Sequence, residues 1–168
     1  MSETSKIREK VSKYLNGVIF YIGCGDDKIT PDAIGIDGRS VFEGGFVQDG
    51  LVNFPEHLKG TVDVVYSSHV LEHMQDDYAT LLAWAELLKK EGKIILYLPD
   101  GRYYNNYENP EHMRDYQYEQ FMFFFKQSLC GQGKNFKGEF LPKIFEVLEE
   151  GQDLGKDRYS FYLVEKKV

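Results

Sequence analysis

The stretch from Val18 to Asp37, VIFYIGCGDDKITPDAIGID, constrains the fold more than any other part of the chain. It opens with an uninterrupted apolar run, VIFYI, which is typical of a strand buried on both faces in a parallel sheet. Gly23 and Gly25 follow at once, where glycines allow a sharp turn and the close approach of a ligand. A second apolar run then ends at Asp37. The sequence therefore predicts two parallel strands with a glycine turn and an acid at one edge of a sheet.

These residues outline a nucleoside site. In open α/β sheets ligands bind at the carboxyl ends of the strands, where an acid can accept hydrogen bonds from both hydroxyls of a ribose. Either signal alone is common, because a glycine pair often marks only a tight turn and an acid after a strand is often a solvated loop residue. A nicotinamide dinucleotide fingerprint needs a third glycine and about twenty residues before the acid. Here Lys28 takes the third position and Asp37 comes sooner, so that alternative is disfavoured.

The composition bounds the class of protein. A chain of 168 residues with 42% hydrophobic and 15% aromatic residues is expected to fold as one domain, 1–168, around one core. The net charge of −7 argues against non-specific binding to nucleic acid or to anionic membranes, which require a basic face. Cys24 and Cys130 stand far apart, so neither a disulfide scaffold nor a zinc knuckle is expected. No membrane span or signal peptide is evident, and a cytoplasmic location is expected.

The remaining chain alternates strand and helix patterns. One amphipathic helix is expected over 7–15, and a second runs from its N-cap at Asp76 to about Lys90, with Gly92 as the stop. The further strands are expected over 46–49, 61–66, 93–98, 144–148 and 159–164, the last two around a turn containing Gly151 and Gly155. This order predicts an α/β fold with a mostly parallel sheet and an antiparallel closing hairpin.

An aromatic and polar segment follows the strand at 93–98, and only its second half has a helical pattern. The phenylalanines of that half have helical spacing and are expected in the core: Phe121, Phe124 and Phe125. The first half is a candidate lid over a bound acceptor, because loops at this edge of a sheet carry function and aromatic faces stack on rings. The candidate lid residues are Tyr103, Tyr104, Tyr107 and His112.

Four segments of the chain resemble one family. They are YIGCG at 21–25, IGID at 34–37, VDVVYSSHVLEHM at 62–74 and LLKKEGKIILYLPD at 87–100. Together they resemble the class I S-adenosylmethionine-dependent methyltransferases, and most closely a small type 11-like group with GCG, SSHVLEH and LPD signatures. The resemblance implies a Rossmann-like fold and S-adenosyl-L-methionine as cofactor. The connection after Gly25 is too short for the full helix that usually follows the first motif.

The resemblance also implies site residues. It places the turn at Gly23, Cys24 and Gly25 under the methionine portion of the cofactor and Asp37 on the ribose. Asp49 would lie near the adenine amine. The residues at the end of the fourth strand would lie beside the methionine portion: Ser67, Ser68 and His69.

The implied reaction is direct displacement of the methyl group by an acceptor atom. Such an enzyme contributes proximity and alignment, with a general base only if the acceptor is a hydroxyl or a protonated amine. Asp100 and His112 are the candidates for that base. The acceptor is expected to be a small molecule or a glycan precursor, since the most similar group occurs in cell-surface sugar pathways.

Two alternatives stand beside this interpretation. Residues 69–73, HVLEH, match the H-x-x-E-H pattern in which two histidines on a helix hold zinc, but the motif directly follows a buried strand and no third ligand is evident. Glu72 and His73 could instead hold a divalent ion near the acceptor, as in some methyltransferases. The prediction is that no metal is bound and that both residues pack or cap the turn. A non-catalytic nucleoside-binding domain on the same fold is the second alternative.

Overall fold

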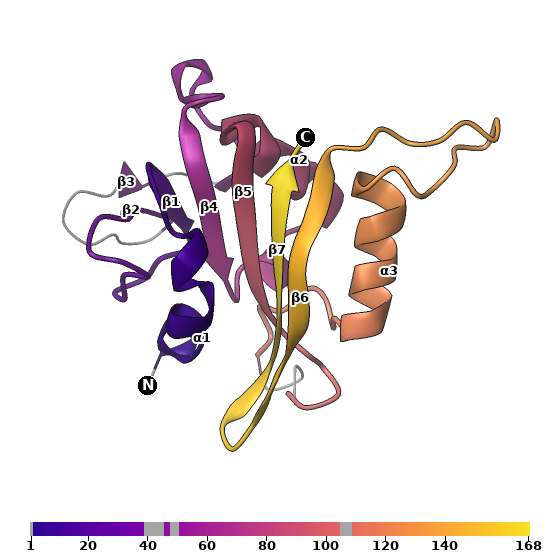
Figure 1. Ribbon diagram of the computed structural model, residues 1–168. Helices are drawn as coiled ribbons and strands as arrows, with labels where there is room; N and C mark the ends of the chain where they lie inside the picture. Colours follow the sequence, from indigo (N-terminus) through magenta and orange to yellow (C-terminus); the bar gives the residue numbers. More distant parts are fainter. Residues whose placement is uncertain (1, 39–45, 48–50, 105–108) are drawn as a thin grey trace.

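A single seven-stranded sheet organises the computed structural model, which describes residues 2–38, 46–47, 51–104 and 109–168 (Figure 1). The strand order across the sheet is β3-β2-β1-β4-β5-β7-β6. The strands are β1 (Ile19–Ile22), β2 (Ile34–Asp37), β3 (Phe46–Val47), β4 (Val62–Ser68), β5 (Leu88–Pro99), β6 (Phe145–Gly155) and β7 (Arg158–Lys167).

Strands β1 to β5 pair in parallel, whereas β7 runs antiparallel to both β5 and β6. This arrangement confirms the predicted α/β fold with a mostly parallel sheet and an antiparallel C-terminal hairpin. The order of strands reverses at β1, with β2 on one side and β4 on the other. Such a reversal in an α/β sheet is where a ligand crevice is expected.

Helices cover the two faces of the sheet unequally (Figure 1). The helix α1 (Glu3–Val11) lies on one face, and α2 (Asp77–Leu87) and α3 (Tyr118–Leu129) lie on the opposite face. The described residues also include short 3₁₀ helices at η1 (Ser12–Tyr14), η3 (Glu56–Leu58) and η4 (Leu71–His73). Residues 23–33, all of which the structure describes, form turns rather than a helix, as the short connection predicted.

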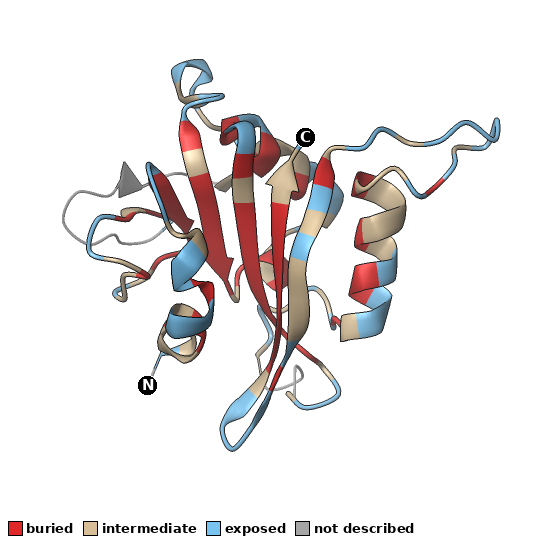
Figure 2. Ribbon diagram, in the orientation of Figure 1, coloured by how far each residue is buried: buried red, intermediate tan, exposed pale blue. Residues whose placement is uncertain are grey.

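The core follows the two-residue period of the strands. On β4, Val64 and Tyr66 pack with α1, whereas Val65 packs on the α2 and α3 side. Phe121 and Phe125 are 3% and 0% exposed, as predicted for the core face of the last helix, whereas Phe124 is only partly buried. Figure 2 shows the same pattern, since the central strands are buried along most of their length and β6 at the sheet edge is not. Among the described residues, no helix combines the length and apolar character needed to cross a membrane.

Two predicted helix bounds were wrong. The first helix spans Glu3–Val11 rather than 7–15, because Ser2 caps it by accepting a hydrogen bond from the Ser5 amide. Asp76 caps α2 as predicted, but the helix ends at Leu87 and the chain enters β5 directly. Pairing of Leu88 with Val62 of β4 buries Leu88 completely. Burial in the sheet thus prevails over the helical propensity of the following lysines and glutamate.

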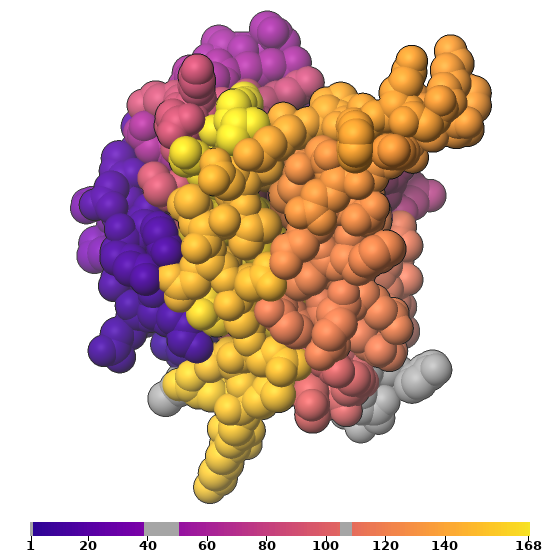
Figure 3. Space-filling model, turned by 45° about the vertical axis from the view of Figure 1, so that its right-hand side comes forward, coloured from indigo at the N-terminus to yellow at the C-terminus, as the bar shows by residue number. Residues whose placement is uncertain are grey.

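The closing hairpin is longer than predicted. The turn predicted around Gly151 and Gly155 lies inside β6, and the strands reverse only after Gly155. A Cβ at Gly151 would lie 3.0 Å from the Tyr162 ring, so this glycine admits a tyrosine across the strand pair rather than a turn. The hairpin tip projects from the body, as does the arm formed by residues 131–143 after α3 (Figure 3).

Candidate active site

A cavity of about 620 Å³ opens where β1, β2 and β4 end at the carboxyl edge of the sheet. Its lining combines the glycine turn after β1, the acid that ends β2 and the segment that follows β4. The lining residues are Gly23, Gly25, Asp37, Gly38, Leu51, His69, Val70, His73, Met74, Glu111 and Met113. The sequence correctly predicted that the glycine turn and Asp37 would meet at one edge of the sheet.

The glycine turn has a backbone that other residues adopt only with strain. Gly23 and Gly25 have φ values of +73° and +49°, in the left-handed region. A Cβ at Gly23 would lie 2.0 Å from Cγ2 of Val70, whereas a Cβ at Gly25 would meet no atom within 4 Å. Gly23 is therefore required for packing against the segment after β4, and Gly25 leaves open space on the cavity side. The Cys24 side chain is 3% exposed and packs in the core on the α1 side, so it points away from the cavity.

Asp37 is held against the glycine turn. The Gly25 amide donates a hydrogen bond of 3.0 Å to Oδ2 of Asp37, and Gly23 is tied to the same strand through its amide and the Ile36 carbonyl. Asp37 is partly exposed and lines the cavity. The other predicted acid, Asp49, lies outside the described residues.

The loop after the glycine turn is secured by α1 in place of a following helix. Arg8 donates hydrogen bonds to Oδ1 of Asp27 at 2.8 Å and to the carbonyls of Lys28 and Ile29 at 2.7 and 3.1 Å. Ser2, the N-cap of α1, also contacts Asp27. The N-terminal helix thus supports the turn that borders the cavity.

The end of β4 contributes differently from what was predicted. Ser67 and Ser68 are buried within the strand, at 1% and 6% exposure, and neither is among the residues that line the cavity. His69 does line it, with a left-handed φ of +53°. Nε2 of His69 lies 2.9 Å from Oγ of Ser160, and burial lowers the pKa of His69 to about 3. This histidine is therefore neutral at physiological pH.

A buried carboxylate follows in η4. Glu72 is 0% exposed, and neither of its carboxylate oxygens has a hydrogen-bond partner among the described residues. Burial raises the pKa of Glu72 to about 8. Its Oε1 lies 3.8 Å from Nδ1 of His69 and 4.0 Å from Nε2 of His73.

The loop after β5 brings His112 to the same place. The rings of His73 and His112 meet edge to face with centroids 4.5 Å apart. Sequence reasoning considered Glu72 and His73 as one pair and His112 separately, and the structure joins the three. Burial and the neighbouring His73 lower the pKa of His112.

Asp100, the other predicted base, is engaged in an ion pair. It is 0% exposed, and its two oxygens accept hydrogen bonds from Nε and Nη2 of Arg102 at 3.0 and 2.7 Å. Burial alone would raise the pKa of Asp100, but the hydrogen bonds from Arg102 outweigh it and leave the pKa below its usual value. Such a carboxylate is a poor proton acceptor, and Asp100 is not among the cavity-lining residues.

Part of the predicted lid lies against this edge. The Tyr104 ring stacks on Tyr159 with centroids 4.7 Å apart and tilts over His112 at 5.6 Å. Tyr103 is 55% exposed, and Tyr107 lies outside the described residues. A second cavity of about 690 Å³ adjoins the first, shares His73, Met74 and Met113 with it, and extends to the N-terminus of α2.

Comparison with known proteins finds one family model over part of the chain and similar folds over nearly all of it. A family model for a methyltransferase domain matches residues 38–96. The structure of 1,6-didemethyltoxoflavin-N1-methyltransferase from Burkholderia thailandensis, with bound 1,6-didemethyltoxoflavin and S-adenosylhomocysteine, is similar with a TM-score of 0.69 and 9% identity. The match covers 99% of this chain and 79% of the Burkholderia chain. The chain has the Rossmann-like fold of the S-adenosylmethionine-dependent methyltransferases.

Other methyltransferase structures share the fold. A SAM-dependent methyltransferase from Archaeoglobus fulgidus matches with a TM-score of 0.58 and 17% identity, over 98% of this chain and 94% of that one. A Haloferax volcanii methyltransferase, solved in complex with the Trm112 activator, matches with a TM-score of 0.68 and 12% identity, over 98% and 90%. No curated protein sequence matches this chain significantly. The family uses S-adenosylmethionine, as predicted.

The geometry of residues 69–73 does not support the metallohydrolase alternative. The H-x-x-E-H arrangement requires both histidines on one face of an α-helix. Here only Leu71–His73 are helical, as a three-residue 3₁₀ helix, and His69 precedes it with φ +53°. His69 is directed to Ser160 and His73 to the backbone of Glu111.

Proposed function

We propose that the single domain, 1–168, binds S-adenosylmethionine in the cavity at the carboxyl edge of the sheet and transfers its methyl group to a small molecule or glycan precursor. The observation that carries the proposal is the glycine turn facing Asp37. Gly23 is packed so closely that a Cβ would collide with Val70, and Gly25 leaves open the space that a cofactor would fill. The residues present therefore fit the cofactor.

The roles of the side chains follow from their positions. Asp37 would accept hydrogen bonds from the ribose hydroxyls, and the backbone at Gly23 to Gly25 would lie under the methionine portion. His69 borders the same cavity, whereas Ser67 and Ser68 would act through the backbone at the end of β4, since their side chains are buried. Asp49 is proposed for the adenine amine on the resemblance alone.

In this reaction the protein mainly aligns the acceptor with the methyl group of the cofactor. The cofactor supplies a methyl group activated on a positively charged sulfur. The chain holds the acceptor in line with that methyl group and keeps water away, and such positioning accounts for much of the rate gained in bimolecular reactions. If the acceptor must lose a proton, His112 without a bound metal is the better candidate because Asp100 is paired with Arg102.

The acceptor would lie beside a group of aromatic side chains near His73, which lines the cavity. Tyr104, Tyr159 and His112 form a stacked group beside the loop that follows β5, and flat rings favour a flat or sugar-like acceptor. The similar Burkholderia structure, which contains 1,6-didemethyltoxoflavin, is consistent with a small-molecule acceptor. A non-catalytic binding domain would also bind the cofactor. It is distinguished by an acceptor screen in which S-adenosylhomocysteine is formed or not formed.

Replacing Asp37 by asparagine should weaken S-adenosylhomocysteine binding about 10- to 100-fold, because hydrogen bonds to a charged acceptor contribute roughly 1.5–3 kcal/mol. Asparagine keeps an oxygen for the Gly25 amide, so the turn is retained. Isothermal titration calorimetry measures the change, with the exposed acid of the same turn, Asp26→Asn, as the matched control. Equal affinities for Asp37→Asn and wild type would remove Asp37 from the site.

A further inference from the structure

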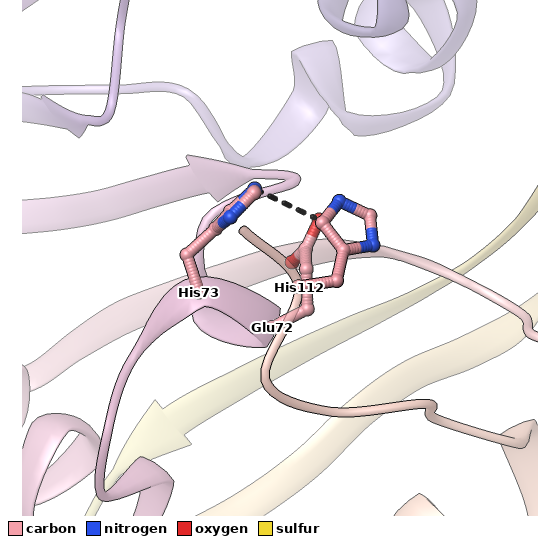
Figure 4. A group of neighbouring side chains, drawn as sticks. All are labelled: Glu72, His73 and His112. Atoms are coloured by element: carbon pink, nitrogen blue, oxygen red, sulfur yellow. Dashed lines mark ion pairs between the residues drawn. The ribbon is translucent and has the colours of Figure 1, made fainter. Parts of the chain in front are cut away.

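We propose that Glu72, His73 and His112 bind a divalent transition-metal ion in the wall of the methyltransferase cavity. The ligand atoms of the three side chains, one from each residue, all lie within 4.8 Å of one another. Figure 4 shows the carboxylate of Glu72 between the two imidazole rings, with η4 supplying two of the residues and the loop after β5 the third.

The first support is the state of Glu72. It is completely buried, and both of its oxygens lack a hydrogen-bond partner among the described residues. A buried carboxylate without a partner is costly, and buried charges are normally paired or coordinate a metal. The nearest cationic or potentially cationic groups are histidines, His69 and His73, at 3.8 and 4.0 Å, which is beyond hydrogen-bond distance. A cation between Glu72 and the imidazoles would satisfy the carboxylate.

The second support is the orientation of His73. Nδ1 of His73 lies 3.1 Å from the carbonyl oxygen of Glu111, so Nδ1 carries the proton and donates it to that oxygen. The other ring nitrogen, Nε2, is the atom left to bind a metal, and it faces Oε1 of Glu72. Histidines that bind metals are almost always oriented in this way, by a carbonyl or carboxylate at the other ring nitrogen.

The backbone fixes the third ligand next to the other two. The Met113 amide donates a hydrogen bond of 2.9 Å to the Glu72 carbonyl, which ties the residue after His112 to η4. Arg114 donates to the Gln75 carbonyl at 2.8 Å. Two segments about forty residues apart are therefore joined on either side of the cluster. This support is what a preorganised ligand set requires.

The ligand set indicates the class of metal. Two imidazoles and one carboxylate suit Zn²⁺, Mn²⁺, Fe²⁺ and Co²⁺, and three protein ligands leave coordination positions open. Bonds of about 2.1 Å place tetrahedral ligand atoms roughly 3.4 Å apart, so the side chains must draw together by about an ångström.

The open positions give the ion a role in recognition. His73 lines the cavity, so they would face its interior. On the proposed function, they would take an oxygen or nitrogen atom of the acceptor.

The test is metal binding by the intact protein without cofactor. After treatment with a chelator, the wild type is titrated with Zn²⁺ and with Co²⁺ by calorimetry, and the visible spectrum of Co²⁺ reports nitrogen coordination. We expect one ion per chain. Glu72→Gln and His112→Ala should each weaken binding about 10-fold or more, since structural ligands contribute strongly to affinity. His57→Gln, which removes an exposed histidine, is the matched control and should bind as the wild type does.

The proposal is overturned if the wild type binds no ion, or if Glu72→Gln binds as tightly as the wild type. Either result would leave Glu72 a buried neutral acid. Two variants on separate segments keep the test decisive if one of them folds poorly. Wild-type affinity for S-adenosylhomocysteine is measured separately with and without metal. Loss of cofactor binding alone would contradict the proposed function, whereas loss of metal binding alone would contradict only the metal site.

Discussion

Gly23→Ala is expected to lower the free energy of unfolding by about 2–5 kcal/mol and to abolish detectable cofactor binding. The left-handed backbone costs an alanine roughly 1–2 kcal/mol. Forcing a methyl group into a packed site costs about 1–3 kcal/mol more. The methyl group would lie 2.0 Å from Cγ2 of Val70, so either the turn or the segment after β4 must move. Urea denaturation measures the stability, and calorimetry with S-adenosylhomocysteine measures the binding.

Gly25→Ala is the matched control, because Gly25 shares the left-handed backbone but has no atom within 4 Å of the added Cβ. It should lose only the roughly 1–2 kcal/mol of backbone strain. Gly25→Ala should also bind the cofactor more weakly than the wild type does, because the added Cβ lies on the cavity side of the turn. Adding Val70→Ala to Gly23→Ala removes the colliding methyl groups and should restore part of the stability. If Gly23→Ala is no less stable than Gly25→Ala, the collision does not matter to the fold.

Glu165→Gln is expected to stabilise the protein at neutral and alkaline pH. Glu165 lies on β7, is 0% exposed, and has no hydrogen-bond partner for either oxygen among the described residues. Burial, with a smaller contribution from Glu150, raises the pKa of Glu165 well above its usual value. The folded protein therefore holds a proton that the unfolded chain releases above the ordinary glutamate pKa. This group makes stability fall as pH rises through that interval, by up to about 1.4 kcal/mol for each pH unit.

Urea denaturation at pH 5 and pH 8 tests this prediction. The difference in unfolding free energy between Glu165→Gln and wild type should be small at pH 5 and should favour the variant by about 1–3 kcal/mol at pH 8. Glu146→Gln, on the neighbouring strand β6 and half exposed, controls for the loss of one carboxyl group. A stability difference that does not change with pH would mean that Glu165 finds a partner when ionised.

The parts of the fold that the sequence predicted correctly are those in which local pattern and tertiary structure agree. The apolar runs of β1 and β2 form paired parallel strands, as predicted. Asp37 is the last residue of β2, so this pairing places it at the same edge of the sheet as the glycine turn after β1. The errors lie where distant partners decide. Leu88 has the sequence context of a helix, but pairing with Val62 makes it a strand residue. The sequence around Gly151 is typical of a turn, but in the structure Gly151 lies within a strand and makes room for the Tyr162 ring on the neighbouring strand.

The candidate site divides in the same way. Gly23, Gly25 and Asp37 lie in one short segment, so their spacing was sufficient to bring them together. The meeting of His73 with His112 depends on a backbone hydrogen bond between η4 and the loop after β5, which no local pattern reports. The pairing of Asp100 with Arg102 is local and could have been anticipated, since the two stand two residues apart in a turn.

The contacts of Arg8 with the loop after the glycine turn have a practical consequence for anyone preparing this protein. Truncated versions that trim the first helix would lose Arg8 and release residues 27–29, which follow the glycine turn that lines the cavity. Weak cofactor binding by such a truncated protein would reflect the loss of the Arg8 contacts rather than an inability of the cavity to bind the cofactor. Affinity tags are accordingly better placed at the other terminus, where Val168 is partly exposed and distant from the glycine turn.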